Sequence, residues 1–388
     1  MRLNRLSRYI LYSLIVIFAI SRMWVSFREY QDIQYSPVST IATILLIFIA
    51  LVPSVFLFKT LVRSGLNAIV LAFMILCLLS SFIYGGNKDT WIIKQVLFII
   101  FWESILFLYY FLAYYNRRVI SENVLMYMLL FIPLTLMFIV SNILRSGLSL
   151  APDKVANNNI FYLLTLLPWL MLLRNRALRL FFIMFIMTMC VYSLKRSAIF
   201  ISAFCSAYYV YHDYLKNGKR VRSLVLGMLA VVVAILLFSY ANKASSGTAF
   251  QRIQSMEEDK GSGRLIRYMD VWELIKREKC ADKILLGHGY RTVEDQLGAH
   301  KSAHNDFLEV IYDYGVIGVI LFTLMHIALI RRVRYLSRIK SPVYPGYFIS
   351  YVIFLIMSLV SHLVIYPTYF IFLTSYWGAV EGGLIKRT

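Results

Sequence analysis

The chain has few of the residues that build disulfide-linked or zinc-binding frameworks. Its 388 residues include four cysteines. Cys77, Cys190 and Cys205 fall in strongly apolar segments, and Cys280 stands alone in a polar one. We therefore expect no disulfide framework and no zinc site. The sequence also lacks a nucleotide-binding P-loop, a dinucleotide-binding glycine fingerprint and the internal repeats that mark many transporters.

Charged residues are scarce as well, at 15% of the chain, and acidic residues number 20 against 40 lysines and arginines. Hydrophobic residues make up 60% and aromatic residues 16%, with a mean hydropathy of +0.69. These values exceed what the core of a soluble protein needs. Apolar runs of roughly 17 to 25 residues recur along the chain, and each is long enough to cross a bilayer as a helix. The sequence predicts an all-α, polytopic transmembrane helical bundle.

We expect about twelve membrane spans, a number that follows from the length needed to cross the hydrocarbon layer. They are predicted near residues 9–27, 39–58, 66–84, 91–114, 120–143, 158–173, 179–194, 197–213, 223–242, 307–330, 346–364 and 366–384. Three regions result. Residues 1–242 hold spans one to nine, residues 243–306 form a large, partly helical loop, and residues 307–388 hold the last three spans.

The net charge of +20 reflects where the basic residues lie rather than an affinity for nucleic acid. Clusters of arginine and lysine fall in alternate loops, which the positive-inside rule places in the cytoplasm. Both termini are then cytoplasmic, and loop 243–306 lies on the outer side of the membrane. The clusters include Arg2, Arg5 and Arg8; Arg117 and Arg118; Arg174, Arg176 and Arg179; Lys219, Arg220 and Arg222; and Arg331, Arg332, Arg334, Arg338 and Lys340.

Ionisable residues within or beside predicted spans are candidates for function, because each is costly in hydrocarbon unless it is paired or hydrated. Glu103 lies in the middle of the fourth span, nine residues after Lys94, and an interhelical polar contact is the simpler interpretation of both. His326 in the tenth span is interpreted as a hydrogen-bonded packing residue. Lys195 and Arg196 form a basic pair where the seventh span reaches the outer face, which suggests a nearby anion.

The loop contains a predicted helix with two arginines on one face. Ser262 can cap a helix that runs to about Lys279, and Arg264, Arg267 and Tyr268 recur on it at the i, i+3 and i+4 positions. Both guanidinium groups fall in the first two turns, near the positive end of the helix dipole. Arginine also pairs bidentately with phosphate oxygens. This segment therefore predicts a phosphate-binding site at the start of the helix.

A solvated helix with internal ion pairs is the alternative. In that interpretation Arg267 pairs with Asp270, and Glu273 pairs with Lys276 or Arg277. Sequence spacing does not separate the two interpretations.

Histidines gather where the loop enters the tenth span. His300 and His304 are four residues apart, as in some metal sites on helices, but a third or fourth ligand is not evident. Histidine can act as a general base near neutral pH. We expect His304 to do so, with Asn305 orienting either the substrate or the ring.

Aromatic side chains in the loop offer a second kind of contact. Tyr268, Trp272 and Tyr290 can stack on sugar faces or pack the loop against the membrane helices. For Trp272 we favour packing. A tight turn is predicted at residues 286–290, and Gly315 and Gly318 are expected to permit close helix packing.

Four motifs in this order resemble the O-antigen ligase and O-antigen polymerase superfamily. They are Ser193-Leu194-Lys195-Arg196-Ser197 at a span end, Gly263-Arg264 followed by Trp272, Leu286-Gly287-His288-Gly289, and His304-Asn305-Asp306-Phe307-Leu308-Glu309 leading to Tyr314-Gly315-Val316-Ile317-Gly318. The resemblance covers about residues 190–320. The earlier spans agree with the family in hydropathy.

The resemblance implies a metal-independent glycosyltransferase that needs no cofactor and uses an undecaprenyl-pyrophosphate-linked glycan as donor. It also implies a location in a bacterial inner membrane, with loop 243–306 on the periplasmic face. It implies that Arg196 and Arg264 hold the pyrophosphate and that His304 is the general base. From adjacency and helix spacing we add Lys195 and Arg267 to the substrate-binding set, together with Tyr268, Asn305 and His300.

Two reactions fit this set of residues. A polymerase would transfer the chain to a lipid-linked repeat unit, and a ligase would transfer it to the lipid A core. We favour the polymerase. A transporter or flippase of a lipid-linked or anionic substrate is the alternative from another class, supported by Glu103, Lys94 and the many spans.

Overall fold

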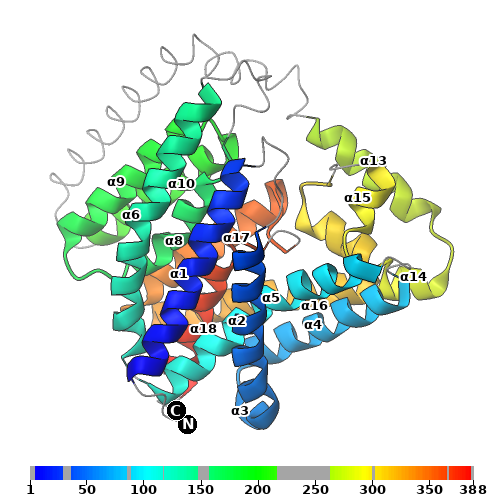
Figure 1. Cartoon of the computed structure of the whole chain (residues 1–388), viewed down its shortest axis with the longest axis horizontal. Helices are drawn as coiled ribbons and strands as arrows, with labels where there is room; N and C mark the ends of the chain where they lie inside the picture. The colour runs from blue at the N-terminus through cyan, green and yellow to red at the C-terminus, as the bar shows by residue number, and fades with distance from the viewer. Residues whose placement is uncertain are drawn as a thin grey trace.

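The chain folds into helices alone wherever its structure is described. The computed structural model describes residues 5–28, 36–84, 89–116, 118–146, 157–215, 263–298, 302–364 and 367–385. The all-α prediction is confirmed for these residues (Figure 1). In chain order the helices are α1 (Arg5–Arg28), α2 (Pro37–Phe56), α3 (Phe58–Leu61), α4 (Gly65–Tyr84), α5 (Asp89–Tyr115), α6 (Val119–Ser146), α8 (Ile160–Leu170), α9 (Arg176–Tyr192), α10 (Arg196–Val210), the π-helix η2 (Tyr211–Leu215), α13 (Arg264–Arg277), α14 (Ala281–Leu286), α15 (Thr292–Leu297), α16 (Asp306–Arg338), α17 (Tyr344–Val360) and α18 (Ile371–Ile385).

Within these ranges, six helices are long and apolar enough to cross a membrane. They are α1, α2, α4, α5, α6 and α16. Helices α8 and α17 are apolar but shorter. The protein is thus a multi-pass helical membrane protein. The predicted number of about twelve spans remains a prediction, because span 223–242 lies outside the described residues and α8, with 11 residues, is shorter than a bilayer crossing requires.

The predicted spans at 346–364 and 366–384 have different bounds in the structure. Helix α17 ends at Val360, because Ser361 leaves the helical region with φ −148° and ψ −144°. Helix α18 begins at Ile371. The link between the two helices is therefore longer than the hydropathy indicates, and it carries His362.

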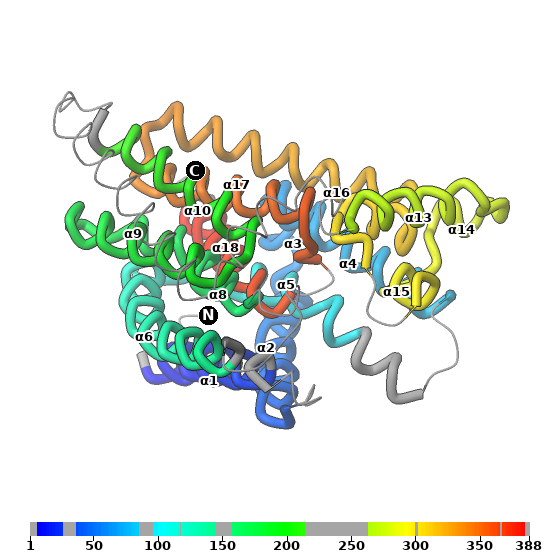
Figure 2. Tube along the Cα trace, turned by 90° about the horizontal axis from the view of Figure 1, so that it is seen from above, coloured from blue at the N-terminus to red at the C-terminus, as the bar shows by residue number. Residues whose placement is uncertain are grey.

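Helices α5 and α18 form the centre of the bundle, between α1, α2 and α6 on one side and α16 and α17 on the other (Figure 2). Two glycines of α18 allow this close contact. An added Cβ would lie 2.2 Å from the Leu106 carbonyl oxygen at Gly378 and 2.1 Å from the Tyr110 carbonyl oxygen at Gly382. This Gly-xxx-Gly spacing is a known means of close packing between membrane helices.

We expect Gly382→Ala to destabilise the protein by about 2 kcal/mol or more, because the new methyl group would press on rigid backbone rather than on a movable side chain. Gly383→Ala is the matched control, since a Cβ there would meet only the Ile120 Cδ1 atom at 4.0 Å. Thermal unfolding of both variants in detergent tests this prediction. Equal melting temperatures would contradict it.

Ion pairs gather where α1 and α6 begin and α18 ends. Arg8 pairs with Glu122 through two hydrogen bonds of 2.9 and 2.8 Å. Glu381 accepts two hydrogen bonds from Arg332 and one of 2.9 Å from the Ser64 hydroxyl. In Figure 1 this end lies at the lower left, whereas α13–α15 lie at the right. These ion pairs and helices α13–α15 thus lie at opposite ends of the bundle.

Helices α13–α15 are fixed on the first half of α16 by backbone-to-backbone contacts. Gly287 follows α14, and an added Cβ would lie 2.2 Å from the Asp313 carbonyl oxygen. Gly315, inside α16, has φ +67° and meets the Leu285 carbonyl oxygen in the same way, at 2.4 Å. The predicted turn at 286–290 and the close packing at Gly315 are both confirmed. Val271, Val293 and Tyr312 form a small buried cluster beneath this group.

Candidate functional site

His304 stands in a constrained turn directly before α16. Its φ is +54°, in the left-handed region that few residues other than glycine adopt. Asn305 caps α16, because its side-chain oxygen accepts hydrogen bonds from the Phe307 amide at 2.9 Å and the Leu308 amide at 3.2 Å. The Asn305 side-chain nitrogen donates to the Leu359 carbonyl oxygen at 3.1 Å. Asn305 thus ties the His304 turn to the end of α17.

Two further side chains hold this turn. The Tyr268 hydroxyl of α13 donates to the carbonyl oxygens of His304, at 3.3 Å, and Leu359, at 3.1 Å. The buried Asp306 carboxylate accepts hydrogen bonds from the amide of Leu363, at 3.1 Å. Helices α13, α16 and α17 therefore meet at His304.

A second histidine, which we did not predict, contacts the first. The rings of His304 and His362 are stacked, with centroids 4.9 Å apart and planes inclined by 19°. His362 Nδ1 lies 3.1 Å from the Ser302 hydroxyl oxygen. His362 comes from the link between α17 and α18, and Asp306 holds that link through the amides of Leu363 and Val364.

Nearby positive charges lower the pKa values of both histidines. The pKa of His304 is lowered to about 3, first by burial and then by the charges of Arg267, Lys195 and Arg264. The pKa of His362 is also well below its usual range, because of burial, the neighbouring His304 and cations that include Lys195. The charges of Arg264, Arg267 and Lys195 thus reach His304, and their grouping as one substrate site stays a prediction.

Lys195 and Arg196 are presented by a sharp turn between α9 and α10. Leu194 has φ +54°, the Lys195 amide donates to the Ser193 hydroxyl at 3.1 Å, and Arg196 is the first residue of α10. Buried asparagines fix this turn. The Asn157 amide donates to the Ser193 carbonyl oxygen at 3.0 Å, and the Asn142 side chain donates to the Tyr192 carbonyl oxygen at 2.6 Å.

Strained backbone accompanies the site. Of the four described residues other than glycine with positive φ, Leu194 precedes Lys195, His304 is the predicted base, and the charge of Arg291 acts on His362. Such residues persist only where surrounding contacts determine them, and they cluster at functional sites. Their positions here indicate that the surroundings of the histidine pair are fixed by the fold.

Helix α13 presents its arginines from its first turns, but its cap differs from the prediction. It spans Arg264–Arg277, and the capping position is Gly263, with φ +72°. Ser262 lies outside the described residues. Glu273 pairs with Lys276 at 3.1 Å, toward the other end of the helix. The predicted alternative of internal pairing thus holds for Glu273 and Lys276.

Three further predictions concern side chains away from the histidine pair. Trp272 is wrongly predicted to pack against the membrane helices: it is 49% exposed, and the Lys276 Nζ atom lies 5.9 Å from its ring centroid. Tyr290, in contrast, is buried. His326 packs between Phe307 and Phe354, and neither ring nitrogen has a hydrogen-bond partner in the described part of the chain. The prediction that His326 forms a hydrogen bond is therefore wrong within the described part of the chain.

Glu103 is fully buried, and its carboxylate oxygens have no hydrogen-bond partner among the residues with a described structure. The side chain of Lys94 is outside that set, so their contact stays a prediction. His300 lies outside it as well. The described residues contain no group of three or more histidine, cysteine, aspartate or glutamate side chains arranged to hold a metal ion.

These features define a multi-pass membrane protein with a cationic, histidine-containing site beside α13 and the start of α16. Residues 180–323 match the family model described as O-antigen ligase. The match runs from α9 into α16 and contains Lys195, Arg196, Arg264, Arg267 and His304. The resemblance to the O-antigen ligase and polymerase superfamily is thereby confirmed over this region. A comparison with curated proteins found no match.

Proposed function

We propose that the protein is an inverting glycosyltransferase that polymerises O-antigen or a related surface polysaccharide at the outer face of a bacterial inner membrane. Its donor is a glycan linked to undecaprenyl pyrophosphate, and its acceptor is a lipid-linked repeat unit. The observation that carries the proposal is the His304 ring, which stands in a left-handed turn, stacks on His362 and has its pKa lowered in part by the charges of Arg267, Lys195 and Arg264. The matched family supports glycan transfer as the reaction class.

In this mechanism the cations bind the donor pyrophosphate, which is already a good leaving group. The acceptor hydroxyl oxygen forms a bond to the anomeric carbon as the bond from that carbon to the pyrophosphate oxygen breaks. His304 takes the proton of the hydroxyl, and undecaprenyl pyrophosphate leaves with the electron pair. Arg264, Arg267, Lys195 and Arg196 stabilise the charge that develops on it, by electrostatic stabilisation of the kind that often dominates catalysis.

Tyr268 and Asn305 serve as positioning residues in this proposal. Their polar atoms bond to the backbone at His304 and to the end of α17. They therefore hold the His304 turn in its left-handed conformation. His300 stays a candidate for acceptor binding.

The ligase is the second candidate, favoured by the description of the matched family model. It would use the same donor and the same proton transfer, with the lipid A core as acceptor. An assay with purified protein and each acceptor offered separately distinguishes the two reactions. If neither acceptor receives glycan, the transporter alternative replaces both.

We expect His362→Ala to lower kcat about tenfold, which corresponds to about 1.4 kcal/mol. The stacked His362 ring keeps the His304 ring in one orientation, and its loss lets that ring rotate away from the acceptor. His362→Phe keeps an aromatic ring in the stack and should recover most of the rate. Equal loss in both variants, with unchanged melting temperatures, would show that the stack does not position His304.

The pH dependence should differ between free and donor-bound enzyme. His304 is active when neutral, and its lowered pKa keeps it neutral in the free enzyme down to about pH 3. Bound pyrophosphate offsets the charges of Arg267, Lys195 and Arg264, so the pKa rises toward its ordinary value in the complex. We therefore expect the acid limb of kcat to lie at higher pH than that of kcat/KM. Coincident limbs, over a range in which circular dichroism shows intact protein, would contradict this.

A further inference from the structure

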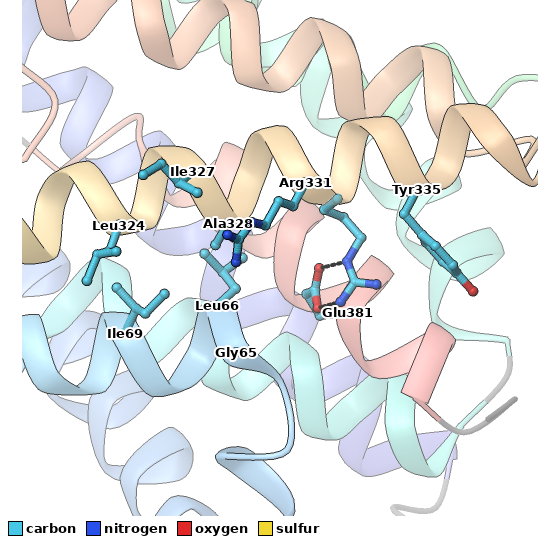
Figure 3. Close-up of a pocket in the computed structure, with 10 residues that line it drawn as sticks. Gly65, Leu66, Ile69, Leu324, Ile327, Ala328, Arg331, Tyr335 and Glu381 are labelled. Atoms are coloured by element: carbon cyan, nitrogen blue, oxygen red, sulfur yellow. Dashed lines mark hydrogen bonds and ion pairs between the residues drawn. The ribbon is translucent and has the colours of Figure 1, made fainter.

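A groove lies between α4 and α16, far from the histidine site. Its volume is about 420 Å³. Leu66 and Ile69 of α4 form one wall, and Leu324, Ile327 and Ala328 of α16 form the other (Figure 3). Arg331 stands at one end of this apolar surface. The groove lies beside Leu324–Tyr335 of α16, beyond the kink at Gly315 and away from the helix start beside His304.

Arg331 and its neighbour Arg332 differ in whether a carboxylate of the protein neutralises their charge. Arg332 is bound by the buried Glu381 carboxylate, with two hydrogen bonds. Arg331 is exposed and forms no ion pair with a carboxylate in the described part of the chain. In Figure 3 its side chain extends along the groove toward Leu66 rather than toward Glu381. A groove with apolar walls therefore opens between two membrane helices. At its polar end, Tyr335 and the Arg332–Glu381 ion pair also line it, and Arg331 is the cation there that Glu381 does not bind.

The groove lies at a depth in the membrane where an ionic lipid headgroup is expected. Arg331 lies near the end of α16, where exposed Arg334, Arg338 and Lys340 follow. Such residues at a helix end mark the boundary between hydrocarbon and water, where arginine and lysine contact anionic headgroups. Leu324 and Ile327, two turns and one turn before Arg331, are 40% and 37% exposed.

We propose that this groove binds one phospholipid with an anionic headgroup. An acyl chain lies against Leu66, Ile69, Leu324 and Ile327, and the headgroup phosphate pairs with Arg331. The groove would recognise the negative charge of the headgroup and would not recognise a glycan. It therefore differs from the proposed donor site beside His304. The bound lipid fills the space between α4 and α16 at the end of α16 opposite His304.

The test is native mass spectrometry of the full-length protein in detergent, titrated with phosphatidylglycerol or phosphatidylcholine of matched acyl chains. We expect one phosphatidylglycerol molecule to be retained, and Arg331→Gln to weaken its retention about tenfold relative to phosphatidylcholine, as loss of a charge-assisted contact predicts. Arg338→Gln is the control, since Arg338 is an exposed residue of the same helix that does not line the groove. It should leave the preference unchanged.

A second variant tests the apolar walls. Ala328→Phe fills the groove, so it should reduce retention of both lipids while the protein keeps its melting temperature. Equal retention of the two lipids by wild type, or equal effects of Arg331→Gln and Arg338→Gln, would overturn the proposal. Stoichiometric displacement of phosphatidylglycerol by a polyprenyl phosphate at equal concentration would assign the groove to a carrier lipid instead and would also overturn it.

Discussion

Replacement of His304 by glutamine is expected to lower kcat about a hundredfold to ten-thousandfold, the range that general-base catalysis contributes. Glutamine has a similar size and can keep hydrogen bonds, but it cannot accept the acceptor proton. Transfer is measured as the formation of a glycan ladder by purified protein. Because His304 adopts φ +54°, the variant His304→Asn, which tolerates this conformation, separates loss of the base from backbone strain.

The control for this prediction is His288→Gln. His288 lies outside the histidine pair, where its ring stacks on Tyr312 with centroids 4.2 Å apart and its Nε2 atom lies 2.6 Å from a Glu278 carboxylate oxygen. A change there tests the stability of the α13–α15 group without removing the base. Activity of folded His304→Gln and His304→Asn variants near that of wild type would remove His304 from the mechanism.

The second large effect is expected for the arginines of α13. Arg264→Gln and Arg267→Gln should each lower kcat/KM about tenfold to a hundredfold, because a hydrogen bond to a charged group contributes about 1.5 to 3 kcal/mol. The double variant should lose more than either one. Arg264→Lys should keep part of the activity, because lysine retains the charge but not the bidentate geometry.

Arg277→Gln serves as the control for both arginines. Arg277 is an exposed residue in the last turn of the same helix, so its loss changes the net charge equally without touching the first turns. If Arg277→Gln lowers kcat/KM as much as Arg264→Gln does, the effect is a general one of charge, and the pyrophosphate site is not at the start of α13.

Much of the fold could be predicted from the sequence because the bilayer imposes a simple rule. Long apolar runs must form helices, and the predicted segments for α1, α2, α4, α5, α6 and α16 correspond to apolar helices of sufficient length. The rule fails at the end of α17. There the predicted span continues to residue 364, but Asp306 accepts hydrogen bonds from the amides of Leu363 and Val364, which stabilises an irregular link.

For the candidate site, too, the sequence pointed to some residues and missed another. Arg264, Arg267, Lys195 and His304 were predicted because their residue types and spacing carry a chemical pattern, and the charges of the first three lower the pKa of His304. His362 was missed because it is distant in sequence and lies within an apolar run that hydropathy assigns to a span. Only the α17–α18 link brings its ring against His304.

Trp272 and His326 were mispredicted for a related reason. Spacing says which residues share a helix face, but it does not say whether another element covers that face. The side of α13 that holds Trp272 is left exposed, and His326 is enclosed by aromatic rings that offer no hydrogen-bond partner. Both outcomes depend on tertiary packing.

The most direct test of the central claim is a transfer assay with purified protein in detergent. An undecaprenyl-pyrophosphate glycan is the donor, and the lipid-linked repeat unit and the lipid A core are offered separately, with His304→Gln assayed in parallel. We predict a glycan ladder on the lipid-linked repeat unit alone, lost in the variant. Transfer to the core alone would make the protein a ligase, and transfer to neither acceptor by folded wild-type protein would contradict the glycosyltransferase account.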